Sequence, residues 1–284
     1  MEVEMGPFPA TLVLATDGSE NTAQATRAAV DIAGRRGSKI HLVHVWHDVP
    51  TSYAHAFVKG ELQRQGRETL DEEVKRIQEK GGTVTRSHLR EGRTFEEALR
   101  LSEETAADLL VVGSRGHSGL RRMLVGSNSE DIVHHAHRPV LVVRSGENVW
   151  PPGRVVAGDD FSEDARKAAK LAANLGNLFG AQMLLLHAVP DLQQASGEAV
   201  EAKLEDRAGE LEDLLQQRPK TRVVAGDPAE VLLEAAQEGE EPALVAVGSR
   251  GLGPVDRLRL GSVSTRVIRA GPGAVLVYPP AGEW

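Results

Sequence analysis

The sequence repeats one glycine pattern. Val111–Ser127 reads VVGSRGHSGLRRMLVGS, and Val247–Ser262 reads VGSRGLGPVDRLRLGS. In both segments a glycine is followed by two residues, a second glycine, nine residues and then Gly-Ser. A shift of 143 positions also aligns Leu12–Val45 with Val155–Ala188, whereas the glycine segments are shifted by 135, so the second copy is eight residues shorter in between. A chain that repeats itself in this way is predicted to contain two copies of one fold.

Length and composition agree with two folded domains. At 284 residues, with 40% hydrophobic and 26% charged residues, the chain can form two cores of ordinary size. Between the copies, Ser145–Gly153 reads SGENVWPPG, and its two prolines and flanking glycines suit neither a helix interior nor a central strand. We therefore predict two domains, residues 1–146 and 153–284.

The composition argues against several classes of protein. There is no cysteine, so disulfides, thiolate metal sites and thiol redox chemistry are excluded. A net charge of −8 argues against a surface that wraps nucleic acid, because such surfaces are broadly basic. No apolar run reaches the roughly 20 residues of a spanning helix, and the first residues do not read as a secretory signal. We expect a cytoplasmic protein that uses neither a membrane nor nucleic acid as a partner.

Short apolar runs alternate with amphipathic segments in both copies. In the first copy, strands are predicted at Thr11–Asp17, Lys39–Trp46, Thr83–Arg90, Asp108–Ser114 and Pro139–Arg144, with helices at Ser19–Gly37, Leu62–Lys80, Phe95–Ala106 and Ser127–His137. In the second copy, strands are predicted at Arg154–Asp160, Gln182–Val189, Thr221–Gly226, Ala243–Ser249 and Ala274–Tyr278, again separated by helices, the last at Ser262–Ala270. Continuous Val/Leu runs are typical of parallel strands buried on both faces. The fold class is therefore α/β, with two doubly wound five-stranded parallel-sheet domains.

Each glycine segment has the features of a phosphate-binding loop. Gly113 and Gly116 allow the backbone to turn and to approach a ligand closely. The amides of Gly126, Ser127 and Asn128, at the start of a helix, can donate to phosphate oxygens. Cations lie in or near the two loops, at Arg115, Arg121, Arg122, Arg250, Arg257 and Arg259. The sequence thus predicts a local anion site in an acidic protein.

These motifs resemble those of the universal stress protein family in its tandem, two-domain form. The resemblance rests on the glycine pattern, the Asp that ends the first strand of each copy, and the His at the end of the second strand. It covers nearly the whole chain. It implies an adenine nucleotide alpha hydrolase-like fold in a pseudo-twofold tandem. The implied ligand is ATP, or ADP or AMP, with or without Mg²⁺.

In ATP-binding members of that family, the glycine loop holds the phosphates, the first-strand Asp lies beside the ribose and adenine, and the backbone after the second-strand His meets adenine. Carried over by position, and with the loop arginines added, the implied ligand-binding residues are Asp17, Val45, Gly113, Arg115, Gly116, Gly126, Ser127 and Asn128 in the first copy and Asp160, Ala188, Gly248, Arg250, Gly251, Gly261, Ser262 and Val263 in the second. The second copy departs from the family pattern at Phe161, Ala188 and Gly253-Pro254, and the first departs at Asn128. Equal affinity of the two sites is therefore not implied.

The Ser and Asp residues also have structural interpretations. Ser127 and Glu130 can form a capping box that starts the helix without any ligand. Asp17 and Asp160 can cap the helices that follow them. Helix capping does not explain the two glycines that precede each helix. These glycines recur at matching positions in both copies, which favours the ligand-binding interpretation.

The histidines are interpreted mainly as structural residues. His44 and His187 are expected to be packed or hydrogen-bonded. Three histidines near a helix end, His134, His135 and His137, place His134 and His137 on one helix face, but a solvated helix end explains them better than a metal site does. His117, beside the glycine loop, is either a phosphate contact or an exposed loop residue. No residue is assigned as a catalytic group or a metal ligand.

Known catalytic motifs are absent from the sequence. Neither glycine loop contains the lysine of a P-loop NTPase, and there is no GxSxG or HExxH motif. We expect a nucleotide-binding stress or regulatory protein that changes the surface it offers to a protein partner. The alternatives are a slow ATPase or autokinase that uses Asp17 or His117, and a scaffold with vacant sites. The resemblance also implies that the fifth strands of the two copies pair antiparallel within one chain; the sequence leaves a further homodimer open.

Overall fold

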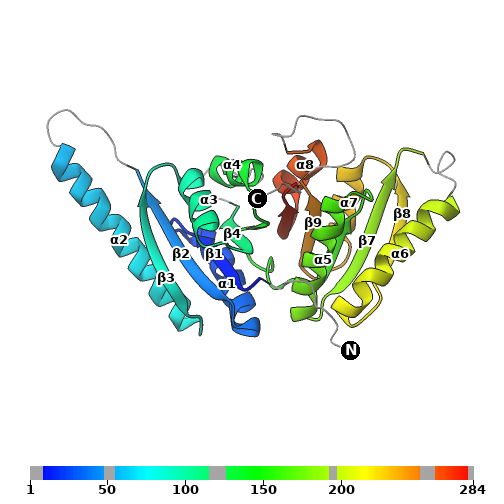
Figure 1. Cartoon of the computed structure of the whole chain (residues 1–284), viewed down its shortest axis with the longest axis horizontal. Coiled ribbons are helices and arrows are strands. Elements are labelled where there is room, and N and C mark those ends of the chain that lie inside the picture. The colour runs from blue at the N-terminus through cyan, green and yellow to red at the C-terminus, as the bar shows by residue number, and fades with distance from the viewer. Residues whose placement is uncertain (1–8, 48–54, 115–125, 192–196, 250–259, 281–284) are drawn as a thin grey trace.

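The structure is a computed structural model that describes residues 9–47, 55–114, 126–191, 197–249 and 260–280. Its two halves repeat the same order of elements, and the outer helices α2 and α6 lie at opposite ends of the molecule (Figure 1). The strands of the first half are β1 (Thr11–Ala15), β2 (Lys39–Trp46), β3 (Val84–Glu91), β4 (Leu109–Gly113) and β5 (Val140–Val143). Its helices are η1 (Glu20–Thr22, a 3-10 turn), α1 (Ala23–Arg36), α2 (His55–Glu79), α3 (Thr94–Glu104) and α4 (Ser127–His135).

The second half has the same elements except the 3-10 turn. Its strands are β6 (Arg154–Gly158), β7 (Gln182–Val189), β8 (Lys220–Ala225), β9 (Ala243–Gly248) and β10 (Ala274–Tyr278), and its helices are α5 (Glu163–Leu178), α6 (Gly197–Leu215), α7 (Pro228–Gln237) and α8 (Ser262–Ala270). The second copy is shorter mainly around its second helix, since α6 has 19 residues whereas α2 has 25.

All ten strands form one sheet, in the order β3-β2-β1-β4-β5-β10-β9-β6-β7-β8. Pairing is parallel within each half, whereas β5 and β10 pair antiparallel at the centre, with Val142 opposite Val275. This pairing confirms the edge arrangement that the family resemblance implied. The two predicted five-stranded sheets are therefore halves of one continuous sheet, and no hydrophobic central edge is left exposed.

Alternate residues of each strand enter cores on opposite faces of the sheet. Leu12 and Leu14 of β1 pack with α1, α2 and their counterparts α5 and α6. Val13 of the same strand packs with the layer formed by α3, α4, α7 and α8. Because both faces are covered, the central strands read as continuous apolar runs.

The segment between the halves packs into both of them. The indole Nε1 of Trp150 donates to Asp31 Oδ2 of α1 at 3.0 Å, and its ring meets that of Phe179, at the end of α5, edge-on at 5.1 Å. Arg144, directly after β5, donates to the carbonyls of Ile268 and Gly271 at 2.7 and 2.9 Å. The guanidinium thus satisfies carbonyls at the end of α8 across the junction.

Several predicted helix boundaries were wrong. Helix α1 begins at Ala23, after the 3-10 turn, instead of Ser19, and α3 ends at Glu104 instead of Ala106. Helix α2 begins at His55 instead of Leu62, because its first apolar residues, Ala56–Val58, are contiguous and are followed by Gly60, which does not favour a helix. Helix α4 ends at His135, where Ala136 turns into an extended conformation, so His134 and His137 do not share a helix face.

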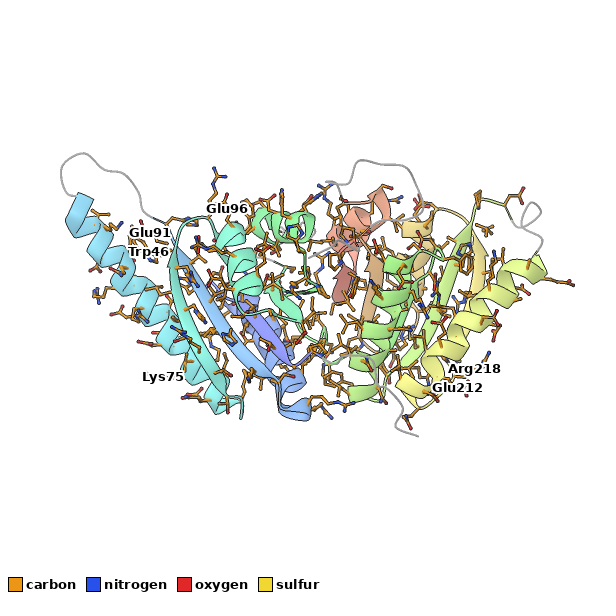
Figure 2. All side chains as sticks on the ribbon, viewed as in Figure 1. Trp46, Lys75, Glu91, Glu96, Glu212 and Arg218 are labelled. Carbon is orange, nitrogen blue, oxygen red and sulfur yellow. The ribbon has the colours of Figure 1, made fainter. Side chains whose placement is uncertain are left out.

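Charged side chains hold the two outer helices against the edge strands. Trp46 and Glu91 lie side by side at the ends of β2 and β3 (Figure 2), and Lys59 of α2 reaches both, at 5.6 Å from the indole ring and 2.8 Å from the carboxylate. In the connection between α6 and β8, Arg218 pairs with Glu212 of α6 at 3.1 Å (Figure 2). No helix within the described ranges has both the length and the apolar composition needed to cross a membrane.

Candidate functional site

A cavity of about 470 Å³ opens at the carboxyl ends of β6, β7 and β9, beside the first turn of α8. It lies where β6 has β7 on one side and β9 on the other, which is the point where ligands bind in open α/β sheets. Of the eight residues predicted for the second copy, the six within the described ranges all line it: Asp160, Ala188, Gly248, Gly261, Ser262 and Val263. The structure therefore brings these six positions, from four separate segments, into one cavity.

The turn after the first strand is built in the same way in both halves. Asp17 Oδ1 accepts the Ser19 amide at 3.0 Å, and Asp160 Oδ1 accepts the Ser162 amide at 3.0 Å. Ser162, not Asp160, is the N-cap of α5, and its hydroxyl accepts the Ala165 amide. In the first half, η1 is preceded by Ser19 as its N-cap. The two aspartates thus hold turns that precede the helices, and the capping interpretation for them was wrong.

The second-strand histidines brace these turns. His44 Nδ1 lies 3.0 Å from the carbonyl oxygen of Thr16, and His187 Nδ1 lies 2.6 Å from that of Asp159. This confirms the structural interpretation of both histidines. His187 also lines the cavity, and the ring of Phe161 lies against it at 4.4 Å.

The first turns of α4 and α8 differ from expectation in two respects. Gly126 and Gly261 are the N-caps, and their amides donate to Ser114 and Ser249 carbonyls at 2.7 and 2.8 Å. The expectation that the Gly126 amide is open to phosphate was therefore wrong. The amides of Ser127, Asn128, Ser262 and Val263 in these first turns do not donate to an acceptor among the described residues.

The capping box does not form. Ser127 lies inside α4 and makes no side-chain cap, because Gly126 occupies the cap position. Glu130 instead pairs with Arg269 of α8 at 2.5 Å and lies 3.8 Å from His134. Its carboxylate thus links the two halves.

A second serine in each helix supports the site, and the sequence analysis missed it. The buried Ser129 hydroxyl donates to the Gly113 carbonyl at 2.7 Å, and Ser264 makes the same bond to Gly248 at 2.7 Å. These bonds tie the helix start to the end of β4 or β9. The recurrence of Gly-Ser-x-Ser in both copies was the signal that could have revealed them.

Packing at Gly113 and Gly248 disfavours any side chain. A Cβ atom on Gly248 would lie 3.0 Å from the Ala165 amide nitrogen, and one on Gly113 would lie 3.3 Å from the Asn21 carbonyl. The ends of β4 and β9 therefore lie directly against the backbone that opens the following helical layer. The adjacent hydroxyls of Ser114 and Ser249 are buried and have no partner among the described residues, so both sites retain an unsatisfied polar group.

One wall of the cavity carries a buried charge pair. Arg207 Nε lies 2.9 Å from Asp159 Oδ2, and the Asp159 side chain is fully buried. Burial raises the pKa of Asp159 above its ordinary value, whereas Arg207 acts to lower it. The corresponding residue in the first half is Thr16, whose hydroxyl accepts the Gly18 amide at 3.0 Å as Asp159 Oδ1 accepts the Phe161 amide at 2.7 Å.

Several predicted residues lie outside the described ranges. They are Arg115, Gly116, His117, Arg121, Arg122, Arg250, Gly251, Gly253, Pro254, Arg257 and Arg259. Among the residues that are described, no group of three or more His, Asp or Glu side chains is arranged to hold a metal ion. His135 Nδ1 instead contacts the Asp131 carbonyl of its own helix at 2.8 Å.

Comparisons with known proteins agree with this architecture. The model of the universal stress protein family matches residues 10–144 and 152–279. A universal stress protein of Mycobacterium tuberculosis H37Rv is 35% identical over 288 residues, covering 94% of this chain and 96% of its own. One from Mycolicibacterium smegmatis is 29% identical over 293 residues, covering 95% and 97%. The crystal structure of a universal stress protein from Archaeoglobus fulgidus has the same fold, with a TM-score of 0.76, 24% identity and coverage of 96% and 99%. The chain belongs to the universal stress protein family and carries two copies of its domain in tandem.

Proposed function

We propose that this protein binds adenine nucleotides at the carboxyl ends of the strands in each half, and that it acts as a regulatory protein through that binding. The observation that carries the proposal is the convergence of six predicted positions on one cavity in the second half. Its volume, about 470 Å³, is within the ordinary range of small-molecule sites.

The lining of the cavity suits the parts of a nucleotide. Ala188, Leu232 and Val247 provide an apolar wall for adenine. Elsewhere in the lining, the first-turn amides of α8 and the Ser262 hydroxyl can donate to phosphate oxygens, which the positive end of the helix also attracts. The carboxylate of Asp160 is placed to accept hydrogen bonds from ribose hydroxyls.

The first half offers the same elements. Asp17 follows β1, Val45 lies near the end of β2, and Ser127 and Asn128 are exposed in the first turn of α4. The two halves differ at Thr16 and Asp159, so the Asp159–Arg207 charge pair beside the second cavity has no equivalent at Thr16 in the first half. We therefore propose two sites of unequal affinity. A regulatory effect requires that the nucleotide bind one arrangement of the protein more tightly than another.

The test uses a charge placed at the phosphate end of the second cavity. Gly261 has φ −63° and ψ 155°, which any residue adopts, and Asp is a favoured N-cap, so Gly261→Asp should fold normally. Its carboxylate would repel phosphates, and we expect the affinity for ATP in calorimetric titration to fall about tenfold or more. Titrations with ADP, AMP and GTP, with and without Mg²⁺, define the preferred ligand.

Two controls make the result specific. Gly34→Asp places the same charge on an exposed part of α1, where nothing lies within 4 Å of the new Cβ, and should leave ATP binding unchanged. Adenosine, which lacks phosphates, should bind the wild-type protein and Gly261→Asp alike. Equal ATP affinity of the second-half site in Gly261→Asp and the wild-type protein would contradict the proposal.

A further inference from the structure

A second cavity of about 470 Å³ lies in the first half, away from the carboxyl ends of the central strands. It begins at Thr11 and Lys39, the first residues of β1 and β2, and continues along the edge strand β3 below the end of α3. We call it the basic pocket and define it by its ionisable residues: Lys39, His41, Arg86, His88, Arg90 and Glu104.

The basic pocket has more positive than negative charge. Arg90 Nη2 pairs with Glu104 Oε2 at 2.5 Å, and that hydrogen bond lowers the pKa of Glu104. Lys39 and Arg86 are exposed, and neither has a carboxylate partner among the described residues. Two uncompensated cations thus flank one cavity in a protein whose net charge is −8.

Two histidines lie in contact at the centre of the basic pocket. His41 Nδ1 is 3.2 Å from His88 Nε2, and the rings stack at 5.5 Å between centroids. One ring therefore donates to the other, while His41 Nε2 and His88 Nδ1 have no partner among the described residues and are available to a ligand.

The surroundings favour the neutral form of both histidines. Burial lowers the pKa of His88 to about 4, with further lowering by His41, Arg90 and Arg86. Burial also lowers the pKa of His41, followed by Arg86 and Lys39. The other charged groups nearby are Glu104 and Arg100 of α3, which lie 3.7 Å apart, and Asp108, whose carboxylate accepts the amides of Ala10 and Thr11. An anion in the pocket would offset the cations and favour protonation of the pair.

The second half shows that the fold does not require this arrangement. His44 pairs with Leu89 in the sheet, and its counterpart His187 pairs with Val223. By this register, Arg222 replaces His88 and is neutralised by Glu238 at 2.6 Å. Lys220 replaces Arg86, and Leu184 stands where the first half has His41. The histidine pair therefore belongs to the first half alone.

We propose that the basic pocket binds a small phosphate-class oxyanion, held by Lys39 and Arg86 and hydrogen-bonded by the one outer N–H that the neutral His41–His88 pair carries. The site is separate from the nucleotide cavity, and it does not depend on the proposed function. The cations beside the histidines disfavour a metal ion as the occupant.

The experiment is a titration of the full chain with inorganic phosphate at constant ionic strength, followed by the imidazole resonances of the histidines in ¹H–¹⁵N spectra. Resonances of His41 and His88 should move together with a single saturable midpoint, whereas His187 reports separately on the nucleotide cavity. At saturation the pKa of His88 should rise by about one unit or more.

Matched variants identify the cation that matters. Arg86→Gln should raise the phosphate concentration at the titration midpoint about fivefold or more. Lys220→Gln, at the corresponding place in the second half, should leave this concentration unchanged. The proposal is overturned if His41 and His88 do not respond to phosphate, or if both variants weaken binding equally. It is also overturned if Zn²⁺, and not phosphate, moves the pair.

Discussion

Arg207 of α6 and Asp159, directly after β6, form a buried ion pair of 2.9 Å at the wall of the second cavity. In the first half, the matching position on α2 carries the opposite charge: Glu73 is buried there and hydrogen-bonds to Thr26 and Arg76. Leu70 and Leu204, both fully buried three residues earlier in their helices, fix this correspondence. The matching positions of α2 and α6 thus carry side chains of opposite charge in the two halves.

Replacing Arg207 should destabilise the protein in a pH-dependent way. Arg207→Gln leaves the buried Asp159 carboxylate without its counter-ion, which should cost about 3 kcal/mol in the free energy of unfolding at neutral pH. The pKa of Asp159 is already raised by burial, and it rises further without Arg207. The folded variant then binds this proton more tightly than the unfolded chain, so the deficit should shrink as the pH falls toward 3.8, the ordinary value. Urea unfolding of the variant and the wild-type protein at several pH values measures this difference in the free energy of unfolding.

Two further variants serve as controls for Arg207→Gln. Adding Asp159→Thr copies Thr16 of the first half and removes the unpaired charge, so the double variant should recover most of the lost stability. Arg218→Gln breaks an exposed pair between the connection after α6 and Glu212 of that helix, and it should have a much smaller effect without the pH trend. A deficit of Arg207→Gln that does not change with pH would contradict this account of Asp159.

Gly248→Ala should destabilise the second half through steric overlap. The new Cβ would lie 3.0 Å from both the Ala165 amide nitrogen and the Asp164 Cβ, so β9 and α5 would have to separate, at a cost of about 1–3 kcal/mol. Gly209→Ala is the matched change. It lies on an exposed helical surface with only the Arg218 side chain 4.0 Å away, and it should stabilise the protein by about 0.5–1 kcal/mol. Thermal unfolding would show opposite shifts in the two variants; equal shifts would argue against the packing role.

Replacing the two serines in the first turn of α8, one at a time, should affect stability and ATP binding separately. Ser264→Ala removes the buried hydrogen bond to the Gly248 carbonyl and should cost about 1–2 kcal/mol of stability. Ser262 is exposed and makes no cap bond, so Ser262→Ala should leave the melting temperature unchanged and weaken ATP binding several-fold. A Ser262→Ala protein that binds ATP like the wild type would remove this hydroxyl from the site.

Much of the fold was predictable from the sequence, because both copies mark their boundaries clearly. The predicted segments Lys39–Trp46, Gln182–Val189, Ser262–Ala270 and Ala274–Tyr278 have the bounds found in the structure. Each of these segments has an apolar run, and nearby glycines or prolines indicate where the helix or strand ends. The start of α2 was missed because Ala56–Val58 form a contiguous apolar run and Gly60, a poor helix former, separates them from Leu62.

The details of the site were less predictable, because they depend on contacts between distant segments. The sequence indicates a glycine at position 126, but not that its amide is already bonded to Ser114. The charge reversal between Glu73 and Arg207 is hidden by the length difference between α2 and α6. The His41–His88 pair requires the register of β2 on β3, which includes an irregularity between Ile40 and His41. None of these follows from residue type and spacing alone.

The central claim, that the cavity between β6, β7, β9 and α8 holds an adenine nucleotide, is tested most directly by a crystal structure obtained at saturating ATP. The account predicts adenine against Ala188 and Leu232, with phosphate oxygens about 3 Å from the amides of Ser262 and Val263. A cavity that contains only solvent under these conditions, or ATP bound at another place on the chain, would contradict it.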